Sequence, residues 1–353
     1  MLKYKIYNSF EGKCLEDWKE ISSNGSYNFF QSYDYLKRIS FKNQKNLKIV
    51  SIFYKNKIIA FLPLEIKKLF FIKILQWIGT EISDYCNPII SKNFYEYIQE
   101  KEFEKIWNNI LADIGDFDLI LFNNQPSNIS NSPNPFTKYL NSIEFSKIYK
   151  IELDGNIDEY FKNLKSKDNK KFYEIQRTLN KLKSLQKDFN VDFEYSDLND
   201  DKINFRQVVY DKIYQLRKKG VKNKLNKDFI EIFQNLIKLN QNKFFLSRLK
   251  INNENVSSCV GIVLNNVYYY YIPMLVSKNY NNFKPGKILI LKIIKWCYEN
   301  KIKYFDFGLG DEKYKENFSN ISIPLHRYLI HRSFLGKIFI LLLKIIFFKK
   351  KFN

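Results

Sequence analysis

The stretch F-D-F-G-L-G-D-E-K-Y-K, from Phe305 to Lys315, holds the side chains whose types and spacing most suggest chemistry. It alternates like a strand until two glycines end the pattern, and Asp311 and Tyr314 follow directly. Ligands of open α/β sheets bind outside the carboxyl ends of strands. A tyrosine there can donate a proton, and an aspartate can accept one or orient a substrate. We therefore predict Asp311 and Tyr314 as catalytic residues.

A structural interpretation stays open for the same two residues. Asp311 could cap the short helix that follows, and Tyr314 could pack beneath that helix. Gly308 and Gly310 do not form a dinucleotide fingerprint, because the third glycine is missing and the position is late in the chain.

A second candidate stretch, N-Y-N-N-F-K-P-G-K-I-L-I, joins a predicted strand to a predicted helix. Pro285 suits the first helical turn, where a missing N–H does no harm. Gly286 allows a ligand to approach the backbone, and the amides of a helix start favour anions. Lys284 and Lys287 add positive charge there. The pattern predicts a pyrophosphate seat, although a plain helix start would have the same sequence.

The predicted strand before this helix, Val267–Val276, contains Pro273. Proline cannot donate to a sheet ladder, so it marks an edge, a bulge or a place where two strands separate. A strand that separates from its neighbour leaves backbone N–H groups available to a ligand. An ordinary edge strand is the other interpretation.

The elements that must position these residues predict an α/β protein of two similar halves. Each half is predicted to hold paired helices, a hairpin, a further strand, a helix and a buried strand. The first hairpin joins Leu47–Tyr54 to Lys57–Ile66, and the second joins Phe244–Ile251 to Val256–Leu264.

Between the halves, Asn156 to Phe189 is predicted to form one long basic helix, because apolar residues recur there at steps of three and four. We expect an N-terminal domain at 1–152, this linking helix at 153–189, a C-terminal domain at 190–332 and a tail at 333–353.

The charge and residue composition limit the classes of molecule that the protein is expected to bind. The 353 residues carry a net charge of +21, which usually points to phosphates, nucleic acid or an anionic membrane. Only seven of the 58 basic residues are arginine, which argues against a nucleic-acid reader and fits compositional drift on solvated faces. Four scattered cysteines and two histidines predict no metal site and reduced thiols in a cytoplasmic protein.

The tail, F-L-G-K-I-F-I-L-L-L-K-I-I-F-F-K-K-K, is apolar apart from Lys337, Lys344 and a basic end. It is shorter than the roughly 20 apolar residues of a spanning helix. The pattern favours an in-plane helix with snorkelling lysines on the inner face of a membrane. A core helix that covers a domain is the alternative.

Together, the Y-Y-Y-Y strand, the K-P-G-K-I-L-I helix start and the G-D-E-K-Y-K segment resemble the C-terminal half of GNAT-type acyltransferases. The chain is most similar to a two-domain subfamily associated with exopolysaccharide or cellulose synthesis, which is related to the Fem-type aminoacyltransferases. In the first half, F-Q-S-Y-D-Y-L, I-I-A-F-L-P-L-E-I and S-D-Y-C-N-P are similar to segments of that subfamily. The resemblance implies tandem GNAT-like domains with mixed sheets.

The resemblance also implies roles for residues. Acetyl-CoA would be the co-substrate, held by Met274, Leu275 and Val276 at its pantetheine and by Lys284, Gly286 and Lys287 at its pyrophosphate. Asp84, Tyr85 and Lys315 would contact the acceptor, although Asp84 and Tyr85 could instead form a turn before Asn87 and Pro88. Phe283 and Ile288 depart from the family's pyrophosphate loop.

We therefore expect an N-acyltransferase that acts on an amino sugar, nucleotide-linked or lipid-linked, in surface polysaccharide synthesis. One alternative is a Fem-like enzyme that uses aminoacyl-tRNA, and another is a non-catalytic partner in a polysaccharide-synthesis complex.

Overall fold

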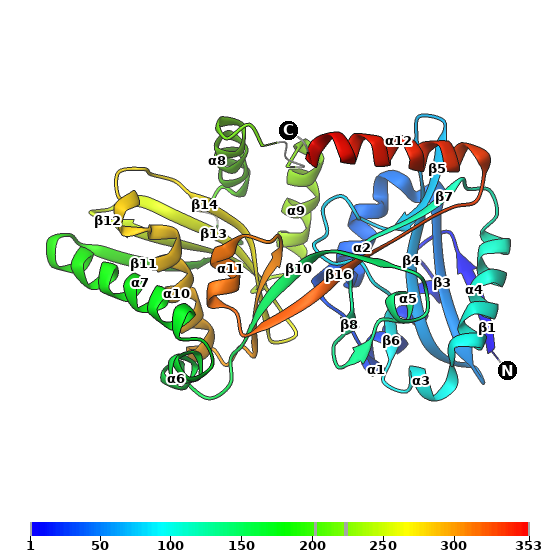
Figure 1. Ribbon diagram of the computed structural model, residues 1–353, viewed down its shortest axis with the longest axis horizontal. Helices are drawn as coiled ribbons and strands as arrows, with labels where there is room; N and C mark the ends of the chain where they lie inside the picture. The colour runs from blue at the N-terminus through cyan, green and yellow to red at the C-terminus, as the bar shows by residue number, and fades with distance from the viewer. Residues whose placement is uncertain (1, 201–202, 222–224, 352–353) are drawn as a thin grey trace. The chain divides into compact units, whose positions relative to one another are not determined.

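The computed structural model describes residues 2–200, 203–221 and 225–351, with the side chains of 42, 167 and 343–351 left undescribed. The chain has a mixed α/β fold and divides into two compact units (Figure 1). Unit 1 combines residues 1–146 with 323–353, and unit 2 is the continuous segment 147–322. Unit 2 is therefore inserted into the sequence of unit 1.

Among the described residues, six strands form the main path of the sheet in unit 1, which two short strands extend, and the first four of the six form an antiparallel meander. The next strand runs parallel to the fourth, and the last is antiparallel to it. In sheet order the strands are β1 (Leu2–Tyr7), β3 (Leu47–Tyr54), β4 (Lys57–Leu69), β5 (Ile72–Trp77), β7 (Leu119–Pro126) and β16 (Ile321–His331).

Helices cover both faces of this sheet because its central strands are apolar on both sides. Helix α4 (Glu100–Ile114) packs on one face, and α1 (Lys13–Asn24) and α2 (Tyr33–Ser40) pack on the other. The smaller elements are η1 (Phe29–Gln31), η2 (Phe41–Asn46), β2 (Gly25–Ser26), β6 (Ile89–Ser91), α3 (Phe94–Tyr97), β8 (Asn128–Ile129), β9 (Ser132–Pro133) and α5 (Pro135–Lys138).

Unit 2 repeats the same strand order and directions. From its meander edge inward the strands are β11 (Val191–Asp197), β12 (Phe244–Ile251), β13 (Glu254–Leu264), β14 (Val267–Leu275), β15 (Tyr304–Leu309) and β10 (Ile143–Glu152). This repetition confirms the prediction of two copies of one α/β arrangement.

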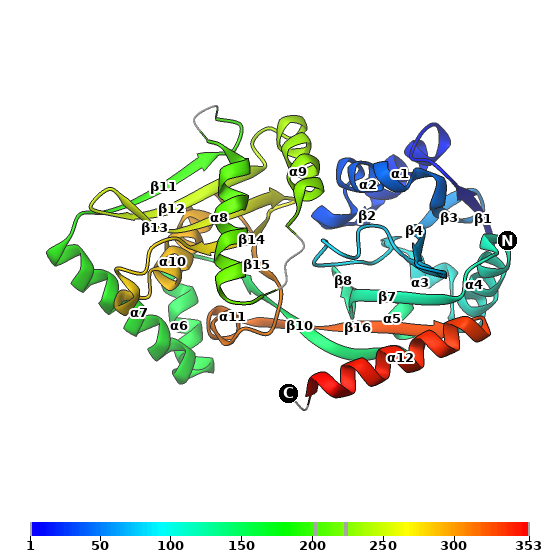
Figure 2. The same ribbon diagram turned by 90° about the horizontal axis from the view of Figure 1, so that it is seen from above.

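The helices of unit 2 also form two groups, which Figures 1 and 2 show on separate sides. One group packs its apolar residues into the core with β14 and β15 and comprises α6 (Ile157–Lys167), α7 (Asn169–Asp188) and α10 (Pro285–Glu299). The other contains α8 (Phe205–Lys218) and α9 (Lys227–Leu239). Two short helices, η3 (Asn281–Phe283) and α11 (Lys313–Phe318), lie in the connections.

The predicted single helix from Asn156 to Phe189 is wrong in one respect, because the segment forms two helices. Asp168 adopts φ −156° and ψ 88°, which ends α6, and its side chain accepts the Lys171 N–H to start α7. Tyr160, Ile175 and Leu185 are buried in the core of unit 2. Both helices are therefore part of unit 2, whereas the sequence suggested a separate link.

The other boundaries also differ from those expected. Residues 323–332 belong to unit 1, because β16 pairs with β7. The tail forms α12 (Phe334–Lys351), which packs Phe339 and Ile340 against β5 and β7 in the same unit. The predicted snorkelling side chain of Lys344 lies outside the described residues. No described helix combines the length and the apolar character that crossing a bilayer requires.

Candidate active site

The strands β14 and β15 of unit 2 separate, as the sequence predicted. Their parallel pairing in the described chain consists of Val267 with Tyr304, Tyr268 with Phe305 and Tyr269 with Asp306. Beyond this point β15 continues along β10, where Leu309 lies opposite Ile148. The second half of β14 continues along β13 instead, so one of its edges opens.

A bulge in β14 lies where this opening begins. Val260 of β13 pairs with Ile272, but the next residue, Gly261, pairs with Tyr270, so Tyr271 is the extra residue. Its ring stacks on Phe233 of α9, with the ring centroids 5.3 Å apart. The bulge bends β14 away from β15 while β14 stays paired to β13.

Beyond the bulge, the alternation of the strand decides which backbone groups face the opening. The Val276 N–H donates to the Val256 carbonyl on the β13 side, at 3.0 Å. Because backbone groups alternate along a strand, Met274 also faces β13, whereas Pro273 and Leu275 face the open edge. Pro273 has no N–H, so the amide of Leu275 is the donor directed toward the opening.

Two side chains of α8, which sequence reasoning missed, donate hydrogen bonds to backbone carbonyls along this open edge. The Lys212 ammonium donates to the Pro273 carbonyl, and the Gln215 amide donates to the Leu275 carbonyl at 3.0 Å. Burial lowers the pKa of Lys212, and the charges of Glu312 and Lys315 also act on it. Lys212 and the loop before α11 therefore border the same opening. No local motif surrounds Lys212, so its role could not be predicted from the sequence.

The start of α10 lies beside the same strand. Ser257 donates its hydroxyl to the Met274 carbonyl at 3.1 Å. A Cβ added at Gly286 would meet nothing nearer than the Ser257 oxygen, 4.0 Å away. The space in front of Gly286 is therefore open and adjoins the end of β14, which suits the predicted order of pantetheine and pyrophosphate along the site.

The two predicted phosphate lysines differ in their surroundings. Lys284 occupies the N-cap with φ 56° and ψ 57°, and its side chain is exposed. The Lys287 ammonium lies 3.3 Å from the Glu174 carboxylate of α7. Although partial burial would raise the pKa of Glu174, hydrogen bonds from Lys287 and Arg177 lower it. Lys287 is thus an ion-pair partner of α7, and Lys284 is the cation with the greater exposure.

Phe283, one of the two departures from the family pattern, packs within the core of unit 2. Its ring meets that of Phe189 edge-on at 6.1 Å. The Lys181 side chain also donates to the Asn282 carbonyl, so α7 holds the segment before α10. The core contact accounts for an aromatic residue at this position.

Lys315, predicted as a substrate contact, is buried and closes the loop between β15 and α11. Its ammonium donates to the Leu309 carbonyl at 2.6 Å and lies 2.9 Å from the Glu312 carboxylate. Gly310 has φ 125°, and a Cβ there would meet the Glu312 carboxylate at 2.4 Å. This clamp fixes the path of the chain toward α11.

The two predicted catalytic residues lie within the loop that Lys315 closes. Asp311 is exposed and accepts the Lys147 N–H of β10 at 3.2 Å. Tyr314 is half-buried, with its ring edge-on to Phe307 at 6.2 Å. Burial first, and then the charges of Glu312 and Cys259, raise the pKa of Tyr314 above its ordinary value. The phenol therefore keeps its proton at neutral pH, as a proton donor must.

Asp306 is a buried carboxylate to which the sequence analysis assigned no role. It stands at the last position of β15 that pairs with β14, and its carboxylate lies 3.0 Å from the Lys150 ammonium. It also accepts the Gly308 N–H at 2.8 Å. The Asp306 side chain therefore links β15 to β10 at the residue where the pairing of β15 with β14 ends.

In unit 1, the corresponding strands β5 and β7 also separate, but the chain itself fills the gap. Among the described residues, their pairing ends at Leu75 with Ile120. The Cys86 N–H then donates to the Asn124 carbonyl at 2.9 Å, and the Asn124 amide donates to the Ser83 carbonyl at 3.0 Å. The segment around Ser83–Cys86 thus occupies the place that is open in unit 2.

The predicted acceptor residues Asp84 and Tyr85 lie in this filling segment. Tyr85 is buried, and its ring meets Phe30 edge-on at 5.7 Å. Asp84 is partly exposed. Of the two, only Asp84 offers surface to a ligand in unit 1, and their acceptor role stays a prediction.

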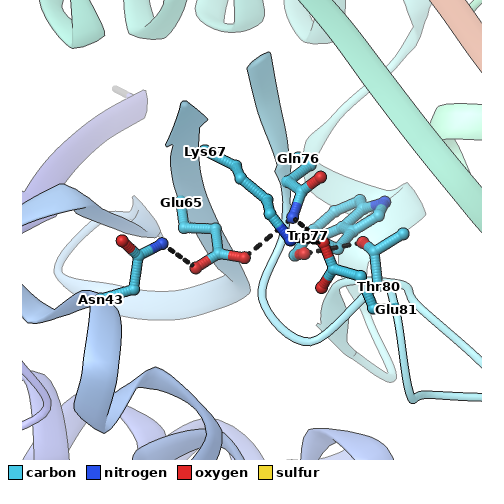
Figure 3. Close-up of polar contacts among 7 residues, drawn as sticks. All are labelled: Asn43, Glu65, Lys67, Gln76, Trp77, Thr80 and Glu81. Atoms are coloured by element: carbon cyan, nitrogen blue, oxygen red, sulfur yellow. Dashed lines mark hydrogen bonds and ion pairs between the residues drawn. The ribbon is translucent and has the colours of Figure 1, made fainter. Parts of the chain in front are cut away.

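A buried polar cluster lies beside the filled gap of unit 1 (Figure 3). The Glu65 carboxylate accepts hydrogen bonds from Gln76 at 2.9 Å and from Asn43 at 2.7 Å. Burial raises the pKa of Glu65 although both hydrogen bonds oppose the rise. Gln76 also reaches Glu81, which pairs with Lys67. The cluster ties β4 and β5 to the loop after β5, which fits a structural role.

A cavity of about 510 Å³ in unit 1 holds none of the predicted site residues. It lies between α4, β7 and β16 and is lined in part by Trp107, Tyr328 and Arg332.

Comparison with known proteins agrees with this geometry. Residues 169–316 match the sequence model of the GNAT acetyltransferase domain, a segment that contains β11 to β15 and the start of α11. No protein among the curated sequences matches the chain.

Solved structures match over nearly the whole chain. FemX superposes with a TM-score of 0.59 at 10% identity, covering 93% of this chain and 97% of FemX. L-PGS from Bacillus licheniformis gives 0.51 at 11% identity, with coverages of 94% and 96%. A tandem GNAT protein from the clavulanic acid biosynthesis pathway gives 0.51 at 6% identity, with coverages of 94% and 98%. The fold of the chain is thus similar to tandem GNAT proteins, and unit 2 contains the segment that matches the GNAT acetyltransferase domain.

Proposed function

We propose that the protein is an acyl-CoA-dependent N-acyltransferase whose donor binds in unit 2. The opening between β14 and β15 carries the proposal. It presents the Leu275 amide to a pantetheine, and it leads to the open helix start at Gly286. A GNAT domain match over 169–316 supports acyl transfer as the class of reaction.

In this proposal each predicted residue has a separate task. Met274, Leu275 and Val276 align the pantetheine along the open edge, and Lys284 with Gly286 faces the pyrophosphate. The amine attacks the thioester carbonyl, and Tyr314 protonates the sulfur as the carbon–sulfur bond breaks. Asp311 accepts the proton that the amine loses, or holds the acceptor.

The acceptor is proposed to be an amino sugar of a surface polysaccharide precursor. This rests on the subfamily resemblance of the sequence. An acetyl-transfer screen tests this proposal. Nucleotide-linked amino sugars are incubated with the protein and acetyl-CoA, and mass spectrometry detects which sugar gains the mass of one acetyl group.

Donor binding has its own test in thermal unfolding. Acetyl-CoA at about a hundredfold excess over its Kd should stabilise the fold by about 2.7 kcal/mol, which raises Tm by several degrees. ATP serves as the control, because it offers phosphates to a chain of net charge +21 without a pantetheine. Equal shifts with both ligands would contradict a pantetheine site.

Gly286 gives this test a matched pair of variants. Gly286→Asp places a carboxylate at the proposed pyrophosphate seat and should abolish the acetyl-CoA shift. Gly286→Ala is the matched control for folding, because its added Cβ meets no protein atom closer than 4.0 Å, and it should lower the acetyl-CoA shift less than the carboxylate does.

One observation favours a second candidate, a Fem-like aminoacyltransferase. The fold similarity to FemX covers 93% of the chain, and α6 and α7 carry many lysines. Protection by aminoacyl-tRNA without protection by acetyl-CoA would support it. Protection by neither ligand would support a non-catalytic partner.

A further inference from the structure

Unit 1 displays large apolar side chains on two segments that are far apart in sequence. The first is the turn between β4 and β5, where Phe70 is 90% exposed and Phe71 is 76% exposed. The second is the outer face of α12, where Phe334 is 76% exposed. We call these residues the apolar ridge, which comprises Leu69, Phe70, Phe71, Phe334, Leu335, Ile338, Leu341 and Leu342.

The two parts of the ridge are neighbours within unit 1. Ile72, the residue after the turn, is buried in a cluster that also contains Phe339 and Ile340 of α12. Figure 1 shows the tip of this hairpin beside α12. The two groups of exposed apolar side chains therefore belong to neighbouring elements of unit 1.

Helix α12 is held on unit 1 by its opposite face. Ser333 donates its hydroxyl to the Asp118 carboxylate at 2.6 Å, and a Cβ at Gly336 would meet the Asp118 carbonyl at 2.1 Å. Gly336, Phe339 and Ile340 lie on the face of α12 that packs on unit 1, because residues three and four apart share one face of a helix. The apolar residues of α12 that belong to the ridge are exposed on the rest of the helix surface. Docking of the helix thus leaves its apolar stripe uncovered by unit 1.

The turn itself is built in an unfavourable way for a bulky residue. Phe70 has φ 55°, a left-handed conformation that a two-residue hairpin normally gives to glycine or asparagine. The other two-residue hairpin turns have polar residues at such positions, namely Lys55 and Asn56, Asn252 and Asn253, and Asn265 and Asn266. No core contact accounts for Phe70 in this conformation, since its side chain is 90% exposed, and the ring is available for an external contact.

The charges around the ridge indicate the partner. Lys68 and Lys337 are exposed beside it and take part in no ion pair among the described residues. The acidic neighbour Asp116 is paired with Lys73, and Asp118 is occupied by Ser333. Two protruding aromatic side chains with cations beside them suit an interface in which rings enter the acyl region and ammonium groups meet phosphates.

We infer that the apolar ridge binds the protein to an anionic lipid surface, with Phe70 and Phe71 inserted and α12 lying in the plane of the interface. This inference is independent of the acyl-transfer chemistry, because it concerns unit 1 alone.

Flotation of the full chain with vesicles tests it. The protein should float with vesicles of phosphatidylglycerol and phosphatidylcholine, and less with phosphatidylcholine alone. Phe70→Ser combined with Phe71→Ser should lower the vesicle-bound fraction by about tenfold, given the apolar area that two rings bury. Phe41→Ser is the control, since Phe41 is 68% exposed elsewhere in unit 1. Equal flotation of both variants would overturn the inference.

A second variant keeps the test independent of folding. Phe70→Trp should shift its emission to shorter wavelength when phosphatidylglycerol vesicles are added. An unchanged spectrum would overturn the inference, and so would dimerisation in light scattering that the double serine variant abolishes while vesicles bind nothing.

Discussion

Tyr314 can protonate a leaving thiolate only while its own hydroxyl keeps its proton. Its half-buried position against Phe307 raises its pKa above the ordinary 10.0, so the phenol is protonated throughout the neutral range. Tyr314→Phe removes this proton donor with little change of shape. We expect kcat to fall by about a hundredfold or more, as for lost general acids, with an unchanged Kd for acetyl-CoA. Unaltered turnover would remove Tyr314 from the acid role.

The same pKa fixes the pH profile. Because the raised pKa keeps the phenol protonated up to pH 10 and above, Tyr314 should cause no loss of activity between pH 7 and 10. Turnover should rise with pH as the acceptor amine loses its proton, and then reach a plateau. An alkaline decline below pH 10 that Tyr314→Phe removes would show that the phenol ionises earlier than its surroundings imply.

At the scale of single residues, the position of Asp311 and Tyr314 after a strand could be predicted from the sequence, because an alternating strand pattern, two glycines and a short helix follow one another there. It could not place Lys212 or Gln215, since their role depends on the tertiary position of α8 beside the open edge of β14. It also could not reveal that the Lys315 ammonium is bound by Leu309 and Glu312.

At the scale of elements, the alternation along β14 makes a sharp prediction. Leu275→Pro removes the amide directed toward the opening, and it should weaken acetyl-CoA binding about tenfold, the value of one hydrogen bond, with a small loss of stability. Met274→Pro removes an amide on the β13 side and should instead lower Tm strongly. Calorimetric titration and thermal unfolding of both variants measure the contrast, and a reversed order would mean that the register is wrong.

The elements themselves were mostly readable from the sequence. The hairpins confirm the expectation, because asparagines at left-handed positions mark their turns. The break between α6 and α7 was missed, since Asp168 stands in a polar run where apolar spacing carries no information. The turn at Phe70 was also missed, because an aromatic residue occupies a left-handed position where turn residues such as glycine or asparagine are expected.

At the scale of the whole molecule, the continuity of unit 2 predicts that it folds alone. All its described strands lie within 147–322 apart from the first residues of β10, whereas unit 1 needs segments from both sides of the insertion. Residues 147–322 should give a cooperative unfolding transition and the acetyl-CoA shift of the full chain. Residues 1–146, which lack β16, should not unfold cooperatively. Circular dichroism and thermal unfolding test both fragments.

If the fragment 147–322 folds but loses the acetyl-CoA shift, the donor site needs unit 1. The sequence could not disclose the insertion. The strand I-S-I-P-L-H-R-Y-L-I-H follows unit 2 in the chain, and its alternating pattern does not say which sheet it joins. Its pairing with β7 rests on contacts that form across about 200 residues of chain.

The insertion also has a consequence for the newborn chain. A ribosome releases residues 1–146 long before residue 331, the end of the strand that flanks β7. At about 5–20 residues per second, the wait is on the order of ten seconds or more. During that time the whole of unit 2 emerges and can fold. The half of the protein that is translated first is therefore completed last, and the edge of β7 stays without its β16 partner until then.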